Sequence, residues 1–233
     1  MTDQPSSPLR RQRHVITIDG PAGAGKSTIA KLLAERLGWF HLDSGATYRT
    51  VAAAAVLRGI ASDDAASLGA LVERLHIEVR QQDGSQRFLA DGEDVTELIR
   101  SPEVTRASSP VSAVPVVRHR LVAIQREIAE GRDTVAEGRD MGTVVFPRAI
   151  VKVFLTASAR VRAARRLNDF RKGSADMTFE QVLRDIEERD MRDSTRAVSP
   201  LRPADDARTI VTDDLSPEQI VEQIVSAYNN AAL

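Results

Sequence analysis

Short apolar runs alternate along this chain with longer segments in which apolar residues recur at helical spacing. The strand-like runs lie at residues 15–18, 39–42, 134–136, 150–155 and 209–211. The helical segments lie at residues 27–37, 46–58, 115–130, 160–170, 179–193 and 217–228. Strands that alternate with helices in this way predict an α/β fold, in which a central parallel sheet carries helices on both faces.

One region interrupts the alternation. Residues 77–80 and 87–90 are two strand-like segments joined through Asp83-Gly84, which is typical of a β-hairpin. We therefore predict that residues 62–104 form a small inserted α+β lobe. The N-terminal residues 1–13 are rich in proline and arginine and predict a disordered basic tail. Residues 14–233 are then expected to form the folded domain.

Composition narrows the classes of partner. The 233 residues contain 32 Lys and Arg against 33 Asp and Glu, so there is no overall attraction to nucleic acid or membrane. The sequence holds no apolar run close to the about 20 residues of a membrane span. It also contains no cysteine, which excludes disulfides and thiolate metal sites and is typical of a reducing compartment. We expect a cytoplasmic protein with no nucleic-acid or membrane partner.

The first strand is followed by a phosphate-binding loop. The pattern G-x-x-x-x-G-K-[ST] is matched by Gly20, Pro21, Ala22, Gly23, Ala24, Gly25, Lys26 and Ser27. Thr28 follows directly and is also a candidate for binding the nucleotide. In such a loop the backbone N–H groups surround phosphate oxygens, Lys26 reaches the β and γ phosphates, and the Ser27 hydroxyl ligates Mg²⁺. Because the match lies between a strand and a helix, it predicts phosphate binding with Mg²⁺ at Ser27.

A phosphate-binding loop does not by itself specify a kinase. A GTPase switch needs an Asp-x-x-Gly segment and an Asn-Lys-x-Asp base-reading motif, and the sequence has neither. A module that binds nucleotide without transferring a phosphoryl group remains open, because only an activity assay separates it from a kinase.

Charged and hydroxyl side chains follow two further strands. The segment after the second strand offers Asp43, Ser44, Tyr48 and Arg49, and residues 137–140 follow the strand at 134–136. The carboxyl ends of parallel strands face the ligand crevice, so these groups are candidates for binding an acceptor. Asp43 and Ser44 are equally well explained as helix N-caps.

Two helical segments carry arginine on one face. Arg189, Asp193 and Arg196 share a face by their spacing, and Arg162, Arg165 and Arg166 do the same on the preceding helix. Charged faces are usually solvated. However, phosphoryl transfer needs several positive charges near the donor and acceptor phosphates, and residues 160–178 could form a lid that supplies them.

Several of these motifs together resemble those of bacterial cytidylate kinases. The resemblance is carried by the loop at 20–28 and by residues 42–49, 138–147, 188–197 and 200–207, and it runs in order from residue 15 to the C-terminus. It implies a P-loop kinase fold with an NMP-binding lobe at 62–104, and transfer of the ATP γ-phosphate to CMP or dCMP by a monomer. Another small-acceptor kinase is the alternative.

The resemblance also implies a role for individual residues. Cytosine would be contacted by Ser44, Ser109, Arg118 and Asp140, and the ribose by Tyr48, Asp193 and Arg196. The CMP phosphate would be bound by Arg49, Arg139 and Arg189, and the lid over ATP would contribute Arg165 and Arg166. Lys26, Arg139, Arg189 and Arg196 would supply the charge for transfer, and Asp43 is a candidate second contact to Mg²⁺, through water. An ionised Asp140 can accept from the cytosine amino group and would repel the uracil carbonyl.

Overall fold

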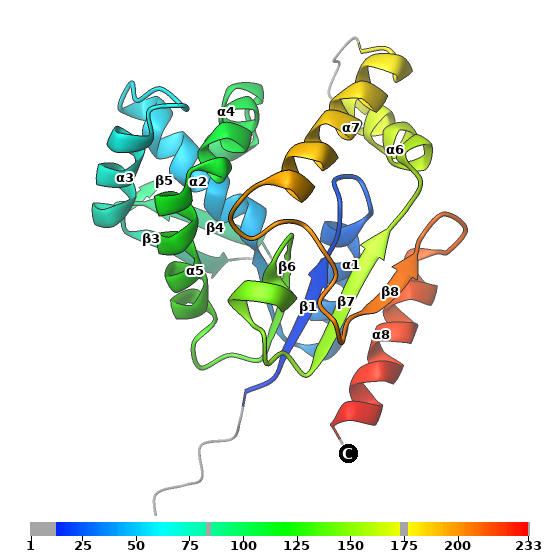
Figure 1. Cartoon of the computed structure of the whole chain (residues 1–233). Helices are drawn as coiled ribbons and strands as arrows, with labels where there is room; N and C mark the ends of the chain where they lie inside the picture. Colours follow the sequence, from blue (N-terminus) through cyan, green and yellow to red (C-terminus); the bar gives the residue numbers. More distant parts are fainter. Residues whose placement is uncertain (1–12, 83–84, 173–176, 233) are drawn as a thin grey trace, which may run out of the picture.

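A computed structural model describes residues 13–82, 85–172 and 177–232 (Figure 1). The predicted tail up to residue 12, the hairpin turn at 83–84 and residues 173–176 of the predicted lid lie outside these ranges. Within them, no helix is both long enough and apolar enough to cross a bilayer.

The centre of the structure is a five-stranded parallel sheet with the strand order β2-β6-β1-β7-β8. Its strands are β1 (Val15–Asp19), β2 (Phe40–Asp43), β6 (Thr134–Gly138), β7 (Val151–Thr156) and β8 (Arg208–Val211). All five were predicted, with ends that differ by one or two residues. The parallel sheet confirms the predicted α/β class.

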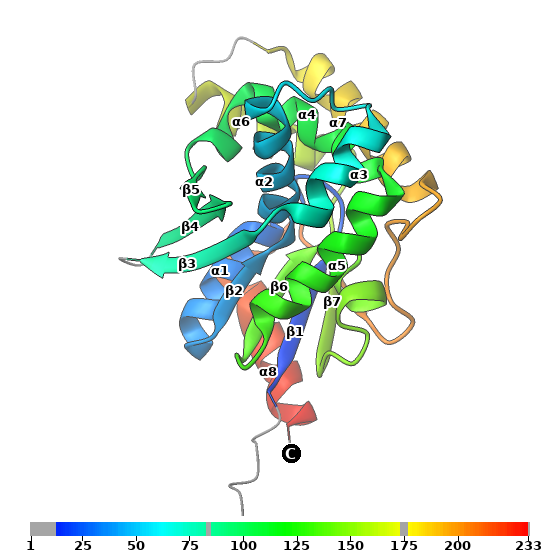
Figure 2. The same cartoon turned by 90° about the vertical axis from the view of Figure 1, so that its left-hand side faces the viewer.

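Helices cover both faces of this sheet, because successive side chains of a strand point to opposite sides. Ile16, Ile18 and Val135 pack with α1 (Lys26–Leu37) and α8 (Pro217–Ala231). On the other face, buried residues of β2 and β6 pack against α5 (Pro115–Ala129) and the π-helical turn η2, which follows β6 (Figure 2). η2 (Met141–Val145) was not predicted.

The inserted lobe contains the second, antiparallel sheet. Its strands are β3 (Ile77–Gln82), β4 (Ser85–Ala90) and β5 (Glu93–Asp94), accompanied by α3 (Ala65–Arg74) and the 3-10 turn η1 (Leu98–Arg100). Leu68, Val72 and Phe88 share one apolar core with residues of α2 (Ser44–Leu57) and α5. The lobe is therefore fused to the main domain through its core rather than joined by a hinge alone.

A helix between the lobe and α5 escaped prediction. α4 (Pro102–Ala113) contains an internal proline, Pro110, and several serines, which are weak helix formers. Its buried Val104 and Val111 belong to the core shared with α2, so tertiary packing stabilises a segment that has low intrinsic helix propensity.

Two helices form a separate layer above the sheet. α6 (Ala159–Lys172) and α7 (Phe179–Thr195) pack against each other through Ala163, Leu167, Val182 and Ile186. Figure 1 shows this pair over the carboxyl ends of β1 and β7, across from α2 and α4. The expectation that Arg189, Asp193 and Arg196 lie on one helical face is corrected, because α7 ends at Thr195 and Arg196 has an extended backbone.

Candidate active site

The phosphate-binding loop connects β1 to α1 at the carboxyl edge of the sheet. Gly23 and Gly25 have positive φ angles of 78° and 90°, a backbone conformation that favours glycine. The Lys26 Nζ atom donates to the Pro21 carbonyl at 2.7 Å, and the side chain is buried. Burial lowers the pKa of Lys26 well below its ordinary value, Arg139 lowers it further, and Glu137 opposes the shift. Negative phosphates at this position would stabilise the charged form.

A buried carboxylate meets the loop serine. The Ser27 hydroxyl donates to Glu137 Oε2 at 2.7 Å, and His41 Nε2 lies 3.0 Å from Glu137 Oε1. Hydroxyl and carboxylate oxygens are ligands that suit Mg²⁺, directly or through its waters. The structure thus places Glu137, rather than the predicted Asp43, against Ser27.

The protein alone offers no complete metal cage. In the described part of the chain, no group of three or more His, Cys, Asp and Glu residues could hold a metal ion. Mg²⁺ commonly keeps several waters and is bound by one or two protein oxygens together with substrate phosphates. The pair of Ser27 and Glu137 fits an ion that enters with the nucleotide.

Helix α6 borders the loop with three arginines that differ in their contacts. Buried Arg162 donates to the Ala22 carbonyl at 3.1 Å and pairs with Asp190 of α7 at 2.6 Å. Arg165 donates to both oxygens of Thr212, at 2.9 and 2.7 Å. Arg165 and Arg166 line a pocket with Lys26, Ser27 and other loop residues. The predicted ATP-side residues therefore lie together.

A buried ion pair connects α5 with the residues that follow β6. Arg118 of α5 donates to Asp140 Oδ2, and both side chains are at most 3% exposed. Arg118 also donates to the Ser112 carbonyl at 3.0 Å, and its guanidinium stands 5.3 Å from the centre of the Tyr48 ring. Three predicted acceptor residues from α2, α5 and the end of β6 thus meet in one buried cluster.

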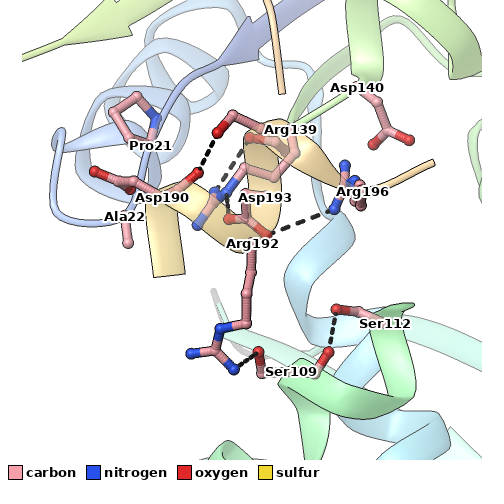
Figure 3. A network of polar contacts seen from close by, with 12 residues as sticks. Pro21, Ala22, Ser109, Ser112, Arg139, Asp140, Asp190, Arg192, Asp193 and Arg196 are labelled. Carbon is pink, nitrogen blue, oxygen red and sulfur yellow. Dashed lines mark hydrogen bonds and ion pairs between the residues drawn. The ribbon is translucent and has the colours of Figure 1, made fainter. Parts of the chain in front are cut away.

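Asp193 joins two further predicted arginines (Figure 3). Its Oδ2 accepts from Arg139 at 2.9 Å, and its Oδ1 lies 3.6 Å from Arg196. Burial raises the pKa of Asp193, but Arg139 and the neighbouring arginines outweigh burial and hold that pKa below its ordinary value. The carboxylate is therefore ionised at neutral pH and keeps both guanidinium groups at the carboxyl edge.

Arg189 completes the positive cluster. Its pKa is lowered to about 10, mainly by burial and next by the nearby charge of Arg139, with smaller effects of Arg166 and Arg49, while Asp193 acts in the opposite direction. Mutual repulsion among these guanidinium groups is what a polyanionic ligand would relieve. The arrangement can therefore bind phosphate groups.

Asp43 and Ser44 both lie at the start of α2. Asp43 caps α2 by accepting from the Ala46 N–H at 2.9 Å, and its other oxygen accepts from Arg49 at 3.0 Å. Ser44 is buried at the start of α2. The N-cap explanation of Asp43 is therefore confirmed.

Ser109 lies where the two sides of the site meet. Its hydroxyl accepts from Arg192 Nη1 at 3.1 Å, which connects α4 with α7 (Figure 3). Arg192 was not among the predicted residues, because an exposed arginine on a charged helix carries no distinguishing sequence signal.

Comparison with known proteins decides the family. The family profile described as cytidylate kinase matches residues 16–230. The chain belongs to the cytidylate kinase family. A cytidylate kinase of Marinomonas sp. is 46% identical over 95% of this chain and 98% of its own length. One from Pseudomonas aeruginosa is 48% identical over 91% and 93%.

A longer relative and a solved structure are also similar to this chain. A bifunctional pantoate ligase/cytidylate kinase of Synechococcus sp. is 48% identical over 96% of this chain but only 42% of its own length. Among solved structures, an uncharacterised protein from Eubacterium ventriosum aligns with a TM-score of 0.51 and 14% identity, over 94% of this chain and 99% of its own. That similarity concerns the fold alone.

The sequence did not predict the contacts of three residues at this site. Glu137 was noted as a strand-end charge but not as the partner of Ser27. Arg162 was noted on a charged face, yet it is buried beneath the loop. Asp19 received no role, although its position at the end of β1 was a usable signal.

Proposed function

We propose that this chain transfers the γ-phosphate of ATP to CMP or dCMP, forming ADP and CDP or dCDP. The observation that carries the proposal is the buried pair of Arg118 and Asp140 beside a phosphate-binding loop, in a chain of the cytidylate kinase family. The aspartate can accept from the cytosine amino group, while the arginine can donate to the ring acceptors.

The donor side would hold ATP at residues 20–28. Lys26 and the loop N–H groups would face the phosphates, and Arg165 and Arg166 line the same pocket as Lys26. Mg²⁺ would be held by Ser27, and Glu137 would hold one of its waters. When bound, the ion neutralises charge on the phosphate oxygens.

The acceptor side would hold CMP across the buried cluster. The base would be bound by Ser44, Ser109, Arg118 and Asp140. Asp43 and Tyr48 lie at the start of α2, next to Ser44. Arg49, Arg139 and Arg189 would bind the CMP phosphate. Asp193 and Arg196 would meet the ribose, and Asp193 would also keep Arg139 in place through the contact at 2.9 Å.

Transfer would be direct and in line, without a covalent enzyme intermediate. The CMP phosphate is already anionic, so the protein needs no strong general base. Lys26, Arg139, Arg189 and Arg196 would stabilise charge on the transferring group, and the α6–α7 layer would exclude water. We also propose a monomer in the cytoplasm, consistent with the cysteine-free sequence.

The deciding experiment is an assay of ADP release with ATP and Mg²⁺ across a panel of nucleoside monophosphates. CMP and dCMP should be the best acceptors, and chromatography should identify CDP and dCDP as products. Preference for AMP, GMP or TMP would favour a different nucleotide kinase, and inactivity with the whole panel would favour a metabolite acceptor.

Replacing Glu137 with glutamine should raise the Mg²⁺ concentration needed for half-maximal activity. Loss of a carboxylate that orients a metal site typically costs about 10- to 100-fold in metal affinity. Mn²⁺ binding in the presence of a non-hydrolysable ATP analogue, followed by electron paramagnetic resonance, measures the effect directly. Glu127→Gln is the control, since Glu127 is an exposed residue of α5 that pairs only loosely with Arg120 at 3.8 Å. An unchanged metal affinity in Glu137→Gln would contradict this role.

Ligand-specific protection should distinguish the lobe from the ATP side. Residues 62–104 share a core with α2 and α5, so deleting them would uncover apolar surface, and hydrogen exchange is the better probe. We expect CMP to slow exchange in the lobe and in α4, and an ATP analogue to slow it at residues 20–28 and in α6. Equal protection of both regions by each ligand would argue against a lobe that serves the acceptor.

A further inference from the structure

The carboxylate of Asp19 holds the loop that follows β6. Asp19 is the last residue of β1 and is 4% exposed. Its Oδ1 accepts from the Met141 N–H at 2.9 Å, and its Oδ2 accepts from the Gly142 N–H at 2.7 Å. Both donors belong to the first residues of η2, directly after Asp140. One carboxylate thus binds the backbone immediately beyond the residue that pairs with Arg118.

The close approach depends on Gly142. A Cβ atom at this position would lie 2.9 Å from Thr17 Oγ1 and 3.4 Å from Asp19 Oδ2, so a larger residue would push η2 away from β1. The backbone of Asp140 itself has φ −145° and ψ 21°, and its side chain makes no hydrogen bond that caps η2. Its orientation is therefore set by Arg118 on one side and by the anchored peptide on the other.

Burying the Asp19 carboxylate away from water costs free energy, which argues for a specific role. The pKa of Asp19 is raised to about 6, mainly by burial, with repulsion from Asp140 as a smaller contribution in the same direction. The bonds from Gly142 and Met141 and the charge of Lys26 act in the opposite direction. At neutral pH the group is ionised, and each bond to it is charge-assisted, shorter and stronger than a neutral hydrogen bond.

We propose that Asp19 is a positioning residue for base selection, which fixes the peptide after Asp140 and so holds the Asp140 carboxylate where it can distinguish cytosine from uracil. This inference rests on the proposed function. It assigns to the end of the ATP-binding strand β1 a part in choosing the acceptor. Asp19 would not touch CMP, because its two oxygens are directed at backbone N–H groups.

The test is a comparison of CMP and UMP in Asp19→Asn. Asparagine keeps the shape but loses the charge and one of the two acceptors. We expect kcat/KM for CMP to fall about tenfold or more, as for loss of a hydrogen bond to a charged group, with a smaller fall for UMP. The ratio of the two should narrow accordingly, while the Kd for an ATP analogue, measured by calorimetry, should change by less than about twofold.

A double-mutant cycle with Asp140→Ala distinguishes positioning of the Asp140 carboxylate from a general effect of Asp19 on the fold. If Asp19 acts through Asp140, Asp19→Asn should no longer change the CMP-to-UMP ratio once Asp140 is alanine. Asp133→Asn is the matched control. Asp133 accepts from the backbone N–H of His14 at 2.8 Å, at the opposite end of β1, and its replacement should leave the ratio unchanged.

Three outcomes would overturn the inference. One is an equal fall in kcat/KM for CMP and UMP in Asp19→Asn. Another is a CMP-to-UMP ratio that Asp19→Asn still lowers in the Asp140→Ala background. The third is a wild type that does not prefer CMP, which would overturn the proposed function as well and is visible before any variant is made. Should Asp19→Asn not fold, Gly142→Ala carries the test, since it displaces the same peptide and should narrow the ratio while Asp19 is intact.

Discussion

Lys26→Ala is expected to lower kcat by about 10²- to 10³-fold or more, because it removes a preorganised positive group from the transferring phosphate. Lys26 lies at the start of α1 with its ammonium group at the loop, 2.7 Å from the Pro21 carbonyl. A buried lysine whose pKa is lowered by its surroundings gains most from an incoming anion, so its charge would act where negative charge develops.

The control lies on the same helix. Lys31 is an exposed residue of α1 that approaches Glu35 at 4.0 Å, and Lys31→Ala should keep the wild-type kcat. Circular dichroism and thermal unfolding verify that Lys26→Ala is folded. A folded Lys26→Ala with near wild-type turnover would exclude Lys26 from the transfer step.

Asp140→Ala is expected to lower stability and base selectivity together. Removing one partner of a buried ion pair leaves the other charge uncompensated, at a cost of about 3–5 kcal/mol in the free energy of unfolding. Arg118 would keep its bond to the Ser112 carbonyl and its place over the Tyr48 ring, but it would lose the only carboxylate that the structure pairs with it among the described residues. Urea unfolding measures this loss.

The effect on selectivity follows from the same contact. For CMP, loss of one hydrogen bond should cost about 1–3 kcal/mol in kcat/KM, and more because Arg118 also loses its carboxylate partner. UMP should lose much less, since an ionised Asp140 opposes its carbonyl. Affinity for ATP should scarcely change, because Asp140 does not line the pocket that Lys26, Ser27 and Arg165 form in the described structure.

Asp140→Asn serves as the informative second variant. Its amide can donate to the uracil carbonyl, so the preference should shift towards UMP while the side chain keeps its volume. If the CMP-to-UMP ratio is the same in wild type, Asp140→Ala and Asp140→Asn, then Asp140 supports the fold or the reaction and does not read the base.

The parts of the fold that sequence predicts well are those with strong local signals. The apolar runs at β1, β6 and β7 and the capped or glycine-terminated helices α1 and α8 were all found within a few residues. α4 and η2 were not, because their conformation depends on partners distant in sequence. α4 is held by burial against α2, and η2 by the carboxylate of Asp19.

The site shows the same division. Strand-end positions and the resemblance selected charged residues that the structure places in ion pairs, including Asp140, Arg139 and Asp193. The direct pairings could not be predicted, since Arg118 and Asp140, like Ser27 and Glu137, are distant in sequence and meet only in the folded chain. Asp43 shows the limit of reasoning from strand ends, because a carboxylate at that place also caps a helix.

The most direct test of the account is kcat/KM of the unmodified protein for CMP and for UMP, measured in the same ADP-release assay at saturating ATP and Mg²⁺. A site built around a buried hydrogen-bonding group discriminates strongly, because the wrong base leaves that group unpaired. We expect CMP to exceed UMP by at least about 10²-fold. A ratio near one, or a preference for UMP, would contradict selection of cytosine by Asp140 and Arg118 and with it the proposed function.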